Sequence, residues 1–245
     1  MRKRAFVIHL ARAAGRVIHV QKLIENCPVE TEVVDAVDGR KLSADEIAAV
    51  YRQDRFFPRY PFVLRPAEIG CFLSHRLCWQ KIVDQDLSHG LVFEDDAGLD
   101  PNKARAAIDL AERHIGTAGY IQLPVRRTPV HAPVVAEAEG AMLLRPPVVP
   151  LRLSGQLISN WAARQLLDLT GVFDRPVDTF LQMHWITDIV PMVVVPSGLA
   201  DYTPAAGGST ISSRKSIVDR VNREVRRMVY RRTIGRLSRR HCVDA

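Results

Sequence analysis

Three consecutive carboxylates, Glu94, Asp95 and Asp96, directly follow the apolar run Leu-Val-Phe. This pattern is typical of a buried strand that reaches the surface at its carboxyl end, where open α/β sheets bind their ligands. Because side chains alternate along a strand, we expect Glu94 and Asp96 on one face and Asp95 on the other. Hard oxygen ligands suit Mg²⁺ or Mn²⁺ better than zinc, so the run predicts a divalent cation held by Glu94 and Asp96. The alternative is a solvated acidic loop after a core strand.

The segments around this run have the order of a nucleotide-binding α/β unit. Residues 5–10 are rich in β-forming side chains, residues 17–26 carry apolar side chains at helical spacing, and residues 31–37 predict a second strand. Ser43 and Glu46 have the spacing of a capping box and predict a helix start. Further along, the pattern predicts helices at 66–84, 101–114 and 160–169 and strands at 120–123 and 189–195.

A polar stripe follows one side of the predicted helix that begins at Pro66. It consists of Glu68, Cys71, His75 and Cys78, at helical spacing. A zinc site built from Cys71, His75 and Cys78 is one interpretation, but one helix rarely supplies all the ligands of a tetrahedral ion and no Cys-x-x-Cys pair accompanies it. The other interpretation, which we favour, is a hydrogen-bonded and partly buried His75.

The composition bounds the class of protein. At 245 residues and 47% apolar, the chain is long enough for one substantial core, and we expect one α/β domain with a tail. No apolar run approaches the roughly 20 residues needed to cross a bilayer, and the apolar stretch near the start is too short for a signal peptide. Four cysteines in a chain with a large core favour free thiols in a reducing compartment, which predicts a cytoplasmic protein.

The positive charge is concentrated at the carboxyl end. The net charge is +7, yet residues 1–213 carry 23 Lys and Arg against 24 Asp and Glu, whereas residues 214–240 carry 11 against 2. The body is therefore near neutral, and the basic excess belongs to the tail. We divide the chain into a domain at 1–213 and a basic tail at 214–245.

The tail predicts a basic amphipathic helix. Ile217, Val221, Val225 and Met228 recur at helical intervals among arginines. Such a helix either docks on an anionic membrane surface, which would place the protein peripherally on the inner face of the cytoplasmic membrane, or packs its apolar side on the domain. Both interpretations stay open at this point.

Two motifs lie about 20 residues apart: Glu-Ile-Gly-Cys-Phe-Leu-Ser-His at 68–75 and Val-Phe-Glu-Asp-Asp at 92–96. Together they resemble glycosyltransferase family 25, the bacterial lipopolysaccharide and lipooligosaccharide glycosyltransferases that share a fold class with collagen galactosyltransferases. Ile-His-Leu-Ala-Arg at 8–12 is similar to the family's Ile-Asn-Leu-Asp-Arg start, with His9 and Ala11 in place of Asn and Asp. The resemblance extends through segments 155–159 and 176–178.

This resemblance implies a GT-A-like fold, a mixed Rossmann-like sheet flanked by helices, and inverting transfer of a hexose from a UDP-sugar, usually galactose. The acceptor would be a glycan, either free or linked to a lipid, that belongs to lipopolysaccharide or another cell-surface saccharide. Glu94 and Asp96 would hold Mn²⁺ or Mg²⁺, and Asp178 in Pro-Val-Asp is the candidate base. The candidate donor-binding residues are Arg12, Arg16, Glu68, Ser74, His75 and Asp95.

Two other classes of function compete with this one. A nucleic-acid-binding protein would use the Arg-rich tail, but the near-neutral body and the lack of interleaved aromatic residues in the tail argue against it. A metal-dependent phosphohydrolase would use the acidic cluster and would release phosphate without an acceptor sugar. For Asp178, a surface acid or a helix cap after the proline is the competing structural role.

Overall fold

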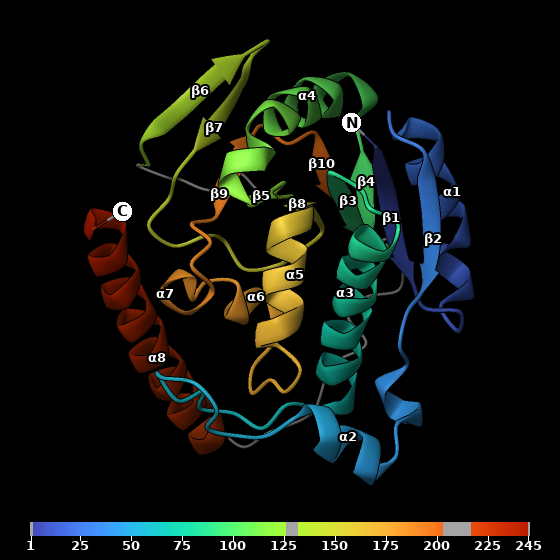
Figure 1. The fold of residues 1–245 in the computed structure, drawn as a ribbon. Coiled ribbons are helices and arrows are strands. Elements are labelled where there is room, and N and C mark those ends of the chain that lie inside the picture. The colour runs from blue at the N-terminus through green and yellow to red at the C-terminus, as the bar shows by residue number, and fades with distance from the viewer. Residues whose placement is uncertain (1, 126–131, 203–216, 245) are drawn as a thin grey trace.

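A computed structural model describes residues 2–125, 132–202 and 217–244 (Figure 1). The main strands are β1 (Lys3–His9), β2 (Thr31–Asp35), β3 (His89–Glu94), β5 (Tyr120–Gln122), β6 (Val134–Ala138), β7 (Ala141–Leu144), β8 (Gly155–Ser159) and β9 (Met192–Val195). They form one mixed sheet in the order β2-β1-β3-β8-β5-β9-β7-β6. Two short strands, β4 (Ala97–Leu99) and β10 (Leu199–Asp201), pair separately and antiparallel.

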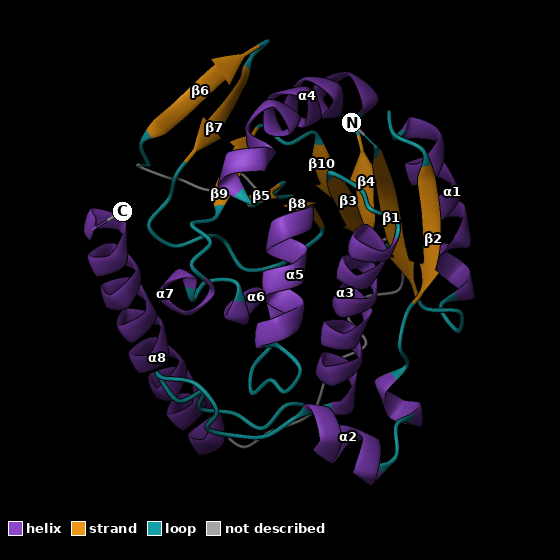
Figure 2. Ribbon diagram, viewed as in Figure 1, coloured by secondary structure: helices purple, strands orange, loops and turns teal. Residues whose placement is uncertain are grey.

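Helices cover both faces of the sheet (Figure 2). One face carries α1 (Val17–Asn26) and α4 (Pro101–Ala118). The other carries α3 (Pro66–Asp84), α5 (Asn160–Leu169), the short α6 (Val177–Phe180) and α7 (His184–Thr187), and the long α8 (Ile217–Asp244). The remaining helix, α2 (Ala44–Val50), begins with the predicted capping box of Ser43 and Glu46.

The central strands divide their side chains between two cores. Phe6 and Ile8 belong to the core under α3 and α5, while Ala5 and Val7 belong to the core under α1 and α4. Strands buried on both faces are expected to be almost continuously apolar, as β1 and β3 are in the sequence. The predicted fold class is therefore confirmed: a single α/β domain with a mixed sheet between helical layers and a basic carboxyl-terminal helix.

Three neighbouring parallel strands place the acidic run at one edge of the sheet. β1 pairs in parallel with both β2 and β3, so the carboxyl ends of all three meet at the same edge. β3 ends at Glu94, and the turn through Asp95 and Asp96 leads into β4. The carbonyl of Asp96 accepts a hydrogen bond from the N–H of Tyr202 at 2.9 Å, just after β10. The small β4–β10 sheet thus holds the acidic turn in place.

Helix α3 brings the second motif to the same edge. At its start, Glu68 accepts a hydrogen bond from the Arg65 N–H at 2.8 Å, so its side chain reaches back to the residue before the helix. One turn later, Gly70 rests on the loop after β2, because a Cβ at Gly70 would lie 2.5 Å from the carbonyl oxygen of Val37. The Ser74 hydroxyl then fastens this contact by accepting from the Val37 N–H at 2.9 Å and donating to the Gly70 carbonyl at 2.7 Å.

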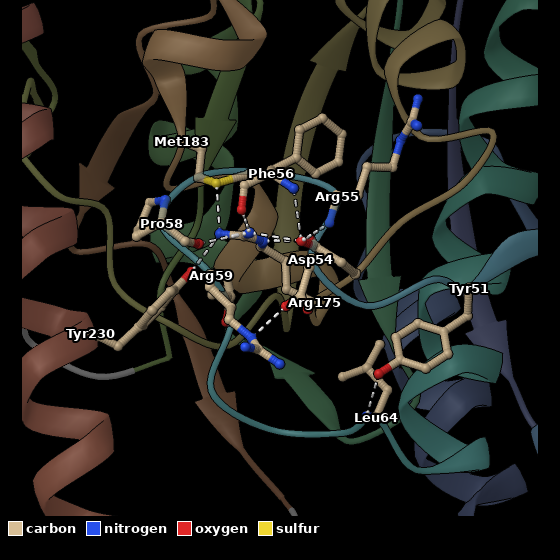
Figure 3. Close-up of polar contacts among 12 residues, drawn as sticks. Tyr51, Asp54, Arg55, Phe56, Pro58, Arg59, Leu64, Arg175, Met183 and Tyr230 are labelled. Atoms are coloured by element: carbon tan, nitrogen blue, oxygen red, sulfur yellow. Dashed lines mark hydrogen bonds and ion pairs between the residues drawn. The ribbon is translucent and has the colours of Figure 1, made fainter.

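A buried arginine connects α8 to the domain (Figure 3). Arg175 is fully buried and makes an ion pair with Asp174, with Nε to Oδ1 at 2.7 Å. Its Nη1 donates to the Tyr230 hydroxyl on α8 at 2.8 Å, and its Nη2 donates to the carbonyls of Phe56 and Pro58 at 2.8 and 2.9 Å. One side chain therefore links α8, the segment before α6 and the loop between α2 and α3, which lie far apart in the sequence.

The face that α8 packs on the domain differs from the predicted one. Tyr230, Ile234 and Ser238 are buried at intervals of four residues, whereas Val225 and Met228 are 47% and 45% exposed. The prediction counted only apolar side chains, but the packing face uses a small residue and a tyrosine that meets the buried arginine. The predicted apolar stripe is therefore not the packing face where its side chains are described, and α8 packs on the domain through Tyr230 and Ile234 instead.

Most element bounds follow the sequence. α1 and α3 occupy the predicted ranges, and α4 continues past the predicted end to Ala118. Residues 124–150 gave no prediction, yet they contain the hairpin of β6 and β7. The predicted boundary between residues 213 and 214 lies outside the described residues. Within the described part of the chain, no helix combines the length and the apolar character that crossing a membrane requires.

Candidate active site

The carboxyl ends of β1, β2 and β3 open into a cavity of about 250 Å³, called here the strand-edge cavity. Its polar lining comes from Arg12, Arg16, Asp38, Ser74, Glu94, Asp95 and Asp96. Six of these seven residues are sequence-predicted site residues. The fold therefore gathers at one sheet edge groups that are up to 84 positions apart in the chain.

A second cavity of about 440 Å³ lies beside the first, between α3 and α6, and is called here the α6 cavity. Glu68 and Asp178 line this cavity but not the first, and so does Tyr60 from the loop before α3. Glu94 and Asp96 line both cavities, whereas Asp95 lines only the strand-edge cavity, in agreement with the predicted alternation. The two acids therefore form a wall that the cavities share.

Glu94 faces α3 and meets two residues of the helix motif. Its Oε1 lies 3.3 Å from His75 Nε2 and 3.9 Å from Cys71 Sγ. His75 is fully buried behind Glu94 and does not line either cavity, and its Nδ1 lies 2.9 Å from Nε2 of Gln156 on β8. His75 thus contacts Glu94 from the buried side of the helix, whereas Cys71 lines both cavities next to Glu94.

Asp95 points to β1 and binds the residue that departs from the family pattern. Its Oδ2 lies 2.9 Å from His9 Nδ1 and accepts from the Leu10 N–H at 3.4 Å. Its Oδ1 accepts from Arg16 Nη1 at 2.5 Å. Asp95 is only 6% exposed, so its contacts fix the strand end and the arginine together. His9 therefore supplies a hydrogen-bonding group at the position where the family has Asn.

The remaining predicted donor-binding residues are already engaged within the protein. Arg12 Nε lies 2.9 Å from Asp38 Oδ2. The Ser74 hydroxyl holds the loop after β2, and Glu68 caps α3. Each still lines a cavity, so these contacts position the side chains at the cleft.

Asp178 lines the α6 cavity together with the acidic wall. Its Oδ1 accepts from the Thr179 N–H at 2.7 Å, and its Oδ2 accepts from the Arg152 N–H at 3.2 Å. Desolvation by the cavity walls, and in smaller part the negative charge of Glu94, raises the pKa of the Asp178 carboxyl despite these hydrogen bonds. A carboxylate with a raised pKa is a stronger proton acceptor than an ordinary surface acid.

The acids fit a hard divalent cation by donor type. Glu94 and Asp96 both line the two cavities, where space for further oxygen ligands from water or substrate adjoins them. Cys78, the third member of the zinc interpretation, is fully buried in the core under α3. The three residues whose ligand atoms all lie within 4.8 Å of one another are instead Cys71, His75 and Glu94.

Sequence reasoning missed several residues that shape the cleft. Tyr60 comes from an aperiodic loop, and only its aromatic character marked it. Gln156 stands inside an apolar strand, and a polar residue at such a position was the available signal, because buried polar groups need partners. Asp38 belongs to an Asp-Gly turn, which predicts a turn and gives no sign of its contact with Arg12.

A comparison with protein families matches residues 2–127 to "Glycosyltransferase family 25 (LPS biosynthesis protein)". The matched part holds β1, β2, β3 and α3, and with them the acidic run and the helix motif. Asp178 lies beyond it.

Relatives with sequence similarity carry names from the same family. Procollagen galactosyltransferase 2 of Mus musculus is 33% identical over 110 residues, which cover 44% of this chain and 18% of that protein. A glycosyltransferase 25 family member of Drosophila pseudoobscura pseudoobscura is 34% identical over 119 residues, 42% of this chain and 19% of that protein. Inactive glycosyltransferase 25 family member 3 of Mus musculus is 33% identical over 114 residues, 44% of this chain and 19% of that protein.

The chain spans about a fifth of the length of these relatives. Their names include both a galactosyltransferase and an inactive protein, so similarity alone assigns no activity to this chain. An activity has to be inferred from the residues of the cleft.

Among solved structures, 4-diphosphocytidyl-2C-methyl-D-erythritol synthase aligns with 94% of this chain and 99% of its own at a TM-score of 0.42 and 14% identity. The inositol-1-phosphate CTP transferase from T. maritima aligns with 85% of this chain and 92% of its own at a TM-score of 0.42 and 12% identity. At this level the likeness says nothing about the site.

Proposed function

The chain belongs to glycosyltransferase family 25, and we propose that it is an inverting, metal-dependent transferase that moves a hexose from a UDP-sugar to a glycan. Galactose is the first choice of sugar because procollagen galactosyltransferases are among its relatives. The acceptor belongs to lipopolysaccharide, lipooligosaccharide or another cell-surface saccharide, in line with the description of the family. The observation that carries the proposal is the acidic wall of Glu94 and Asp96 shared by two cavities.

The strand-edge cavity suits the nucleotide part of the donor. It lies at the carboxyl ends of parallel strands, where α/β sheets bind nucleotides. Arg12 and Arg16 bring guanidinium groups to it, and such groups bind phosphate oxygens through paired N–H donors. Asp38 and Asp95 hold the two arginines at the cavity before the donor arrives.

The shared wall suits the diphosphate. A divalent cation, Mn²⁺ or Mg²⁺, held by Glu94 and Asp96 would supply Lewis-acid stabilisation of the charge that develops on the departing UDP. His75 restrains Glu94 from the core side at 3.3 Å, which keeps this carboxylate at the wall. Asp96 is restrained through its main chain by Tyr202.

The α6 cavity suits the acceptor. Asp178 accepts the proton of an acceptor hydroxyl while the hydroxyl oxygen forms its bond to the anomeric carbon and the bond from that carbon to UDP breaks. Attack from the side opposite the leaving group inverts the configuration. The raised pKa of Asp178 fits a base that gains its proton in this step.

The outer face of α8 suits an anionic membrane surface. Its arginines that are exposed are Arg226, Arg231, Arg232, Arg236, Arg239 and Arg240. Each cation near an anionic lipid surface contributes about 1 kcal/mol at moderate salt. This face supports peripheral attachment at the cytoplasmic face of the membrane, where a lipid-linked acceptor would be reached.

Donor binding and turnover test the enzyme assignment. We expect UDP-galactose to raise the melting temperature of the full chain in Mn²⁺, because a ligand that binds only the native state stabilises it by about 2.7 kcal/mol at one hundred times its Kd. Removal of the metal with a chelator should abolish this shift. Asp96→Ala should lose the metal-dependent shift and all UDP release while keeping its far-UV circular dichroism.

Asp168→Ala, which removes an exposed acid on α5, is the matched control and should behave as the wild type. Wild-type UDP release by Asp96→Ala would refute the role of the acidic wall. Release of inorganic phosphate from the donor without an acceptor would instead favour a phosphohydrolase. A product that retains the α-configuration of the donor, seen by NMR, would refute inversion and the role given to Asp178.

Vesicle binding tests the membrane assignment. Truncation at the tail would also remove Tyr230 and Ile234 from the core, so substitutions on the outer face are cleaner. The triple change of Arg232, Arg236 and Arg239 to Gln should reduce pelleting with anionic vesicles, and salt should weaken the wild type similarly. A triple change of the exposed Lys22, Lys41 and Arg105 to Gln is the charge-matched control. Equal loss in both triple variants would leave only non-specific attraction.

A further inference from the structure

We propose that Cys71, His75 and Glu94 form a binding site for a thiophilic divalent cation, Zn²⁺, which shares Glu94 with the oxygen-ligand pair of Glu94 and Asp96 but uses different partners. One ligand atom from each residue lies within 4.8 Å of the other two. The ligands combine a thiol, an imidazole and a carboxylate, which are the groups that zinc binds in proteins. The inference is independent of sugar transfer, since it concerns the metal alone.

Two of the three ligand-atom separations are close to those around a tetrahedral ion. Cys71 and His75 lie four residues apart on α3 and therefore project from the same side of the helix. Zinc bonds of about 2.0–2.3 Å place neighbouring tetrahedral ligand atoms about 3.4–3.7 Å apart. The separations to Glu94 Oε1, 3.3 Å from His75 Nε2 and 3.9 Å from Cys71 Sγ, are within a few tenths of an ångström of these values.

Gln156 supplies the support that a zinc-bound imidazole needs. To bind a cation through Nε2, His75 must carry its proton on Nδ1 and donate it to an acceptor. Gln156 is fully buried next to Nδ1, and its Oε1 has no hydrogen-bond partner among the described residues. Because the oxygen and nitrogen of an amide are nearly equal in shape, turning the group places Oε1 as the acceptor of the Nδ1 proton.

A second buried amide oxygen without a partner belongs to the neighbouring strand. Gln122 on β5 is the cross-strand partner of Gln156 in the sheet, and its Oε1 likewise lacks a hydrogen-bond partner among the described residues. Directly paired side chains have Cβ atoms about 4.5–5.5 Å apart, which lets one amide donate to the other. The rotation that leaves His75 Nε2 ready to bind a cation therefore gives Gln156 Oε1 a donor and turns its NH₂ group away from His75, on the strand next to Gln122.

The local charge favours a cation as well. The carboxylates of Glu94 and Asp178 line the α6 cavity together with Cys71 and give this part of the cleft a negative field. The same field attracts a divalent ion, which lowers the energy of the thiolate on binding. Cys71 and Glu94 line both cavities, so the fourth position of the ion would face the cleft. Zinc would then compete with the oxygen-ligand cation for Glu94.

Cobalt substitution tests the site without any sugar donor. We expect the full chain to bind one equivalent of Zn²⁺ in calorimetry, and Co²⁺ in its place to give a thiolate-to-metal charge-transfer absorption. Cys71→Ser should lose this absorption and bind Zn²⁺ more weakly by at least tenfold. Cys27→Ser, at the end of α1, is the matched control and should keep both. An absorption that persists in Cys71→Ser, or is absent from the wild type, would overturn the proposal.

The supporting amide can be tested separately. Gln156→Leu removes the acceptor at similar size and should weaken Zn²⁺ binding about 10–100-fold, the usual effect of losing a group that orients a metal-bound histidine. Gln156→Glu keeps an acceptor and should retain binding. Asp96→Ala should keep the cobalt absorption while losing Mn²⁺-dependent UDP-galactose binding, so failure of one site is distinguishable from failure of the other. Unchanged affinity in Gln156→Leu would count against the site as built here.

Discussion

The cluster around Arg175 and the cleft around Glu94 both hold charged groups, but the cluster pairs opposite charges whereas the cleft gathers like charges. Arg175 and Asp174 have relative exposures of 0% and 1%, and the guanidinium meets carboxylate, carbonyl and hydroxyl oxygens on several sides (Figure 3). In the cleft, by contrast, Glu94 and Asp178 line the same cavity and carry the same sign of charge. A charge that is paired within the protein has a structural role. Like charges at a cavity, which the protein does not neutralise, indicate a site that binds a ligand of opposite charge.

The pKa shifts express this difference. Burial alone would lower the pKa of Arg175, but the hydrogen bonds and the charge of Asp174 outweigh it and raise the pKa, so the charged form is favoured. For Asp178, desolvation and the charge of Glu94 act in the same direction and raise the pKa, so the charged form is disfavoured. Substitutions in the cleft should therefore change turnover, and substitutions in the Arg175 cluster should change stability.

The largest effect is expected for Asp178→Asn. An amide cannot accept the proton of an acceptor hydroxyl, so the transfer rate should fall about 10²–10⁴-fold while UDP-galactose binding persists. In the wild type the base must be deprotonated, and its pKa is raised, so the rate should rise with pH through a midpoint above the ordinary range of an aspartate. Initial rates as a function of pH check both statements.

Asp168→Asn serves as the control for this change, because it alters an exposed acid of α5 in the same way. A variant Asp178→Asn that keeps its rate within a few-fold, with the pH midpoint of the wild type, would assign the base to another residue. The cleft would then remain a binding site, and Asp178 would have no role in catalysis.

The next effect belongs to the other cluster. Arg175→Met should reduce the free energy of unfolding by about 3–5 kcal/mol, because it leaves the buried Asp174 without its countercharge. For a chain of this length that loss corresponds to a melting temperature about 6–20 °C lower. Urea unfolding and thermal melting measure it directly. Donor binding by the remaining folded protein should be unchanged, since Arg175 lines neither cavity.

Arg164→Met is the matched control. Arg164 is exposed on α5, and its Nε donates a hydrogen bond to Asn160 Oδ1. Replacing this side chain should reduce the free energy of unfolding by less than about 0.5 kcal/mol. Equal stability of the two variants would mean that the buried ion pair contributes no more than a surface contact.

A smaller effect should follow from Tyr230→Phe. Burial raises the pKa of Tyr230 to about 12, so its hydroxyl stays neutral and accepts from Arg175 at 2.8 Å. Losing one hydrogen bond to a charged group costs about 1.5–3 kcal/mol, and this loss should loosen α8 first. Proteolysis within α8 and thermal melting check it, with Tyr202→Phe, an exposed tyrosine, as the control. Resistance equal to the wild type would show that Ile234 and its neighbours suffice to dock the helix.

The sequence predicts an element well where its signals are local. The start of α3 follows from Pro66 at its first position, a signal that acts within one turn. The hairpin of β6 and β7 gave no such signal, since Val134 and Val135 are exposed on an edge strand and prolines surround it. The packing face of α8 escaped prediction because its key partner, Arg175, lies 55 positions earlier in the chain.

The same distinction applies to the site. Glu94 and Asp96 were predicted as site residues from local sequence, because a buried strand ending in acids is readable within six residues. The grouping of Cys71 and His75 with Glu94 was not, because the third member comes from a different element across the sheet edge. Its support by Gln156 depends on which strands are neighbours, and strand order is not written in local periodicity.

The smallest effect concerns how far the structural cluster extends into the basic tail. The guanidinium carbon of Arg223 lies 4.5 Å from the centre of the Phe62 ring, so Arg223→Gln should cost about 0.5–1 kcal/mol of stability through the lost cation–π contact. Arg226→Gln, one turn away and exposed, is the charge-matched control and should leave stability unchanged. A difference in urea midpoint between the two variants would assign Arg223 to folding. Equal midpoints, with equal losses of binding to anionic vesicles, would assign both arginines to the outer surface and confine the structural cluster to Tyr230.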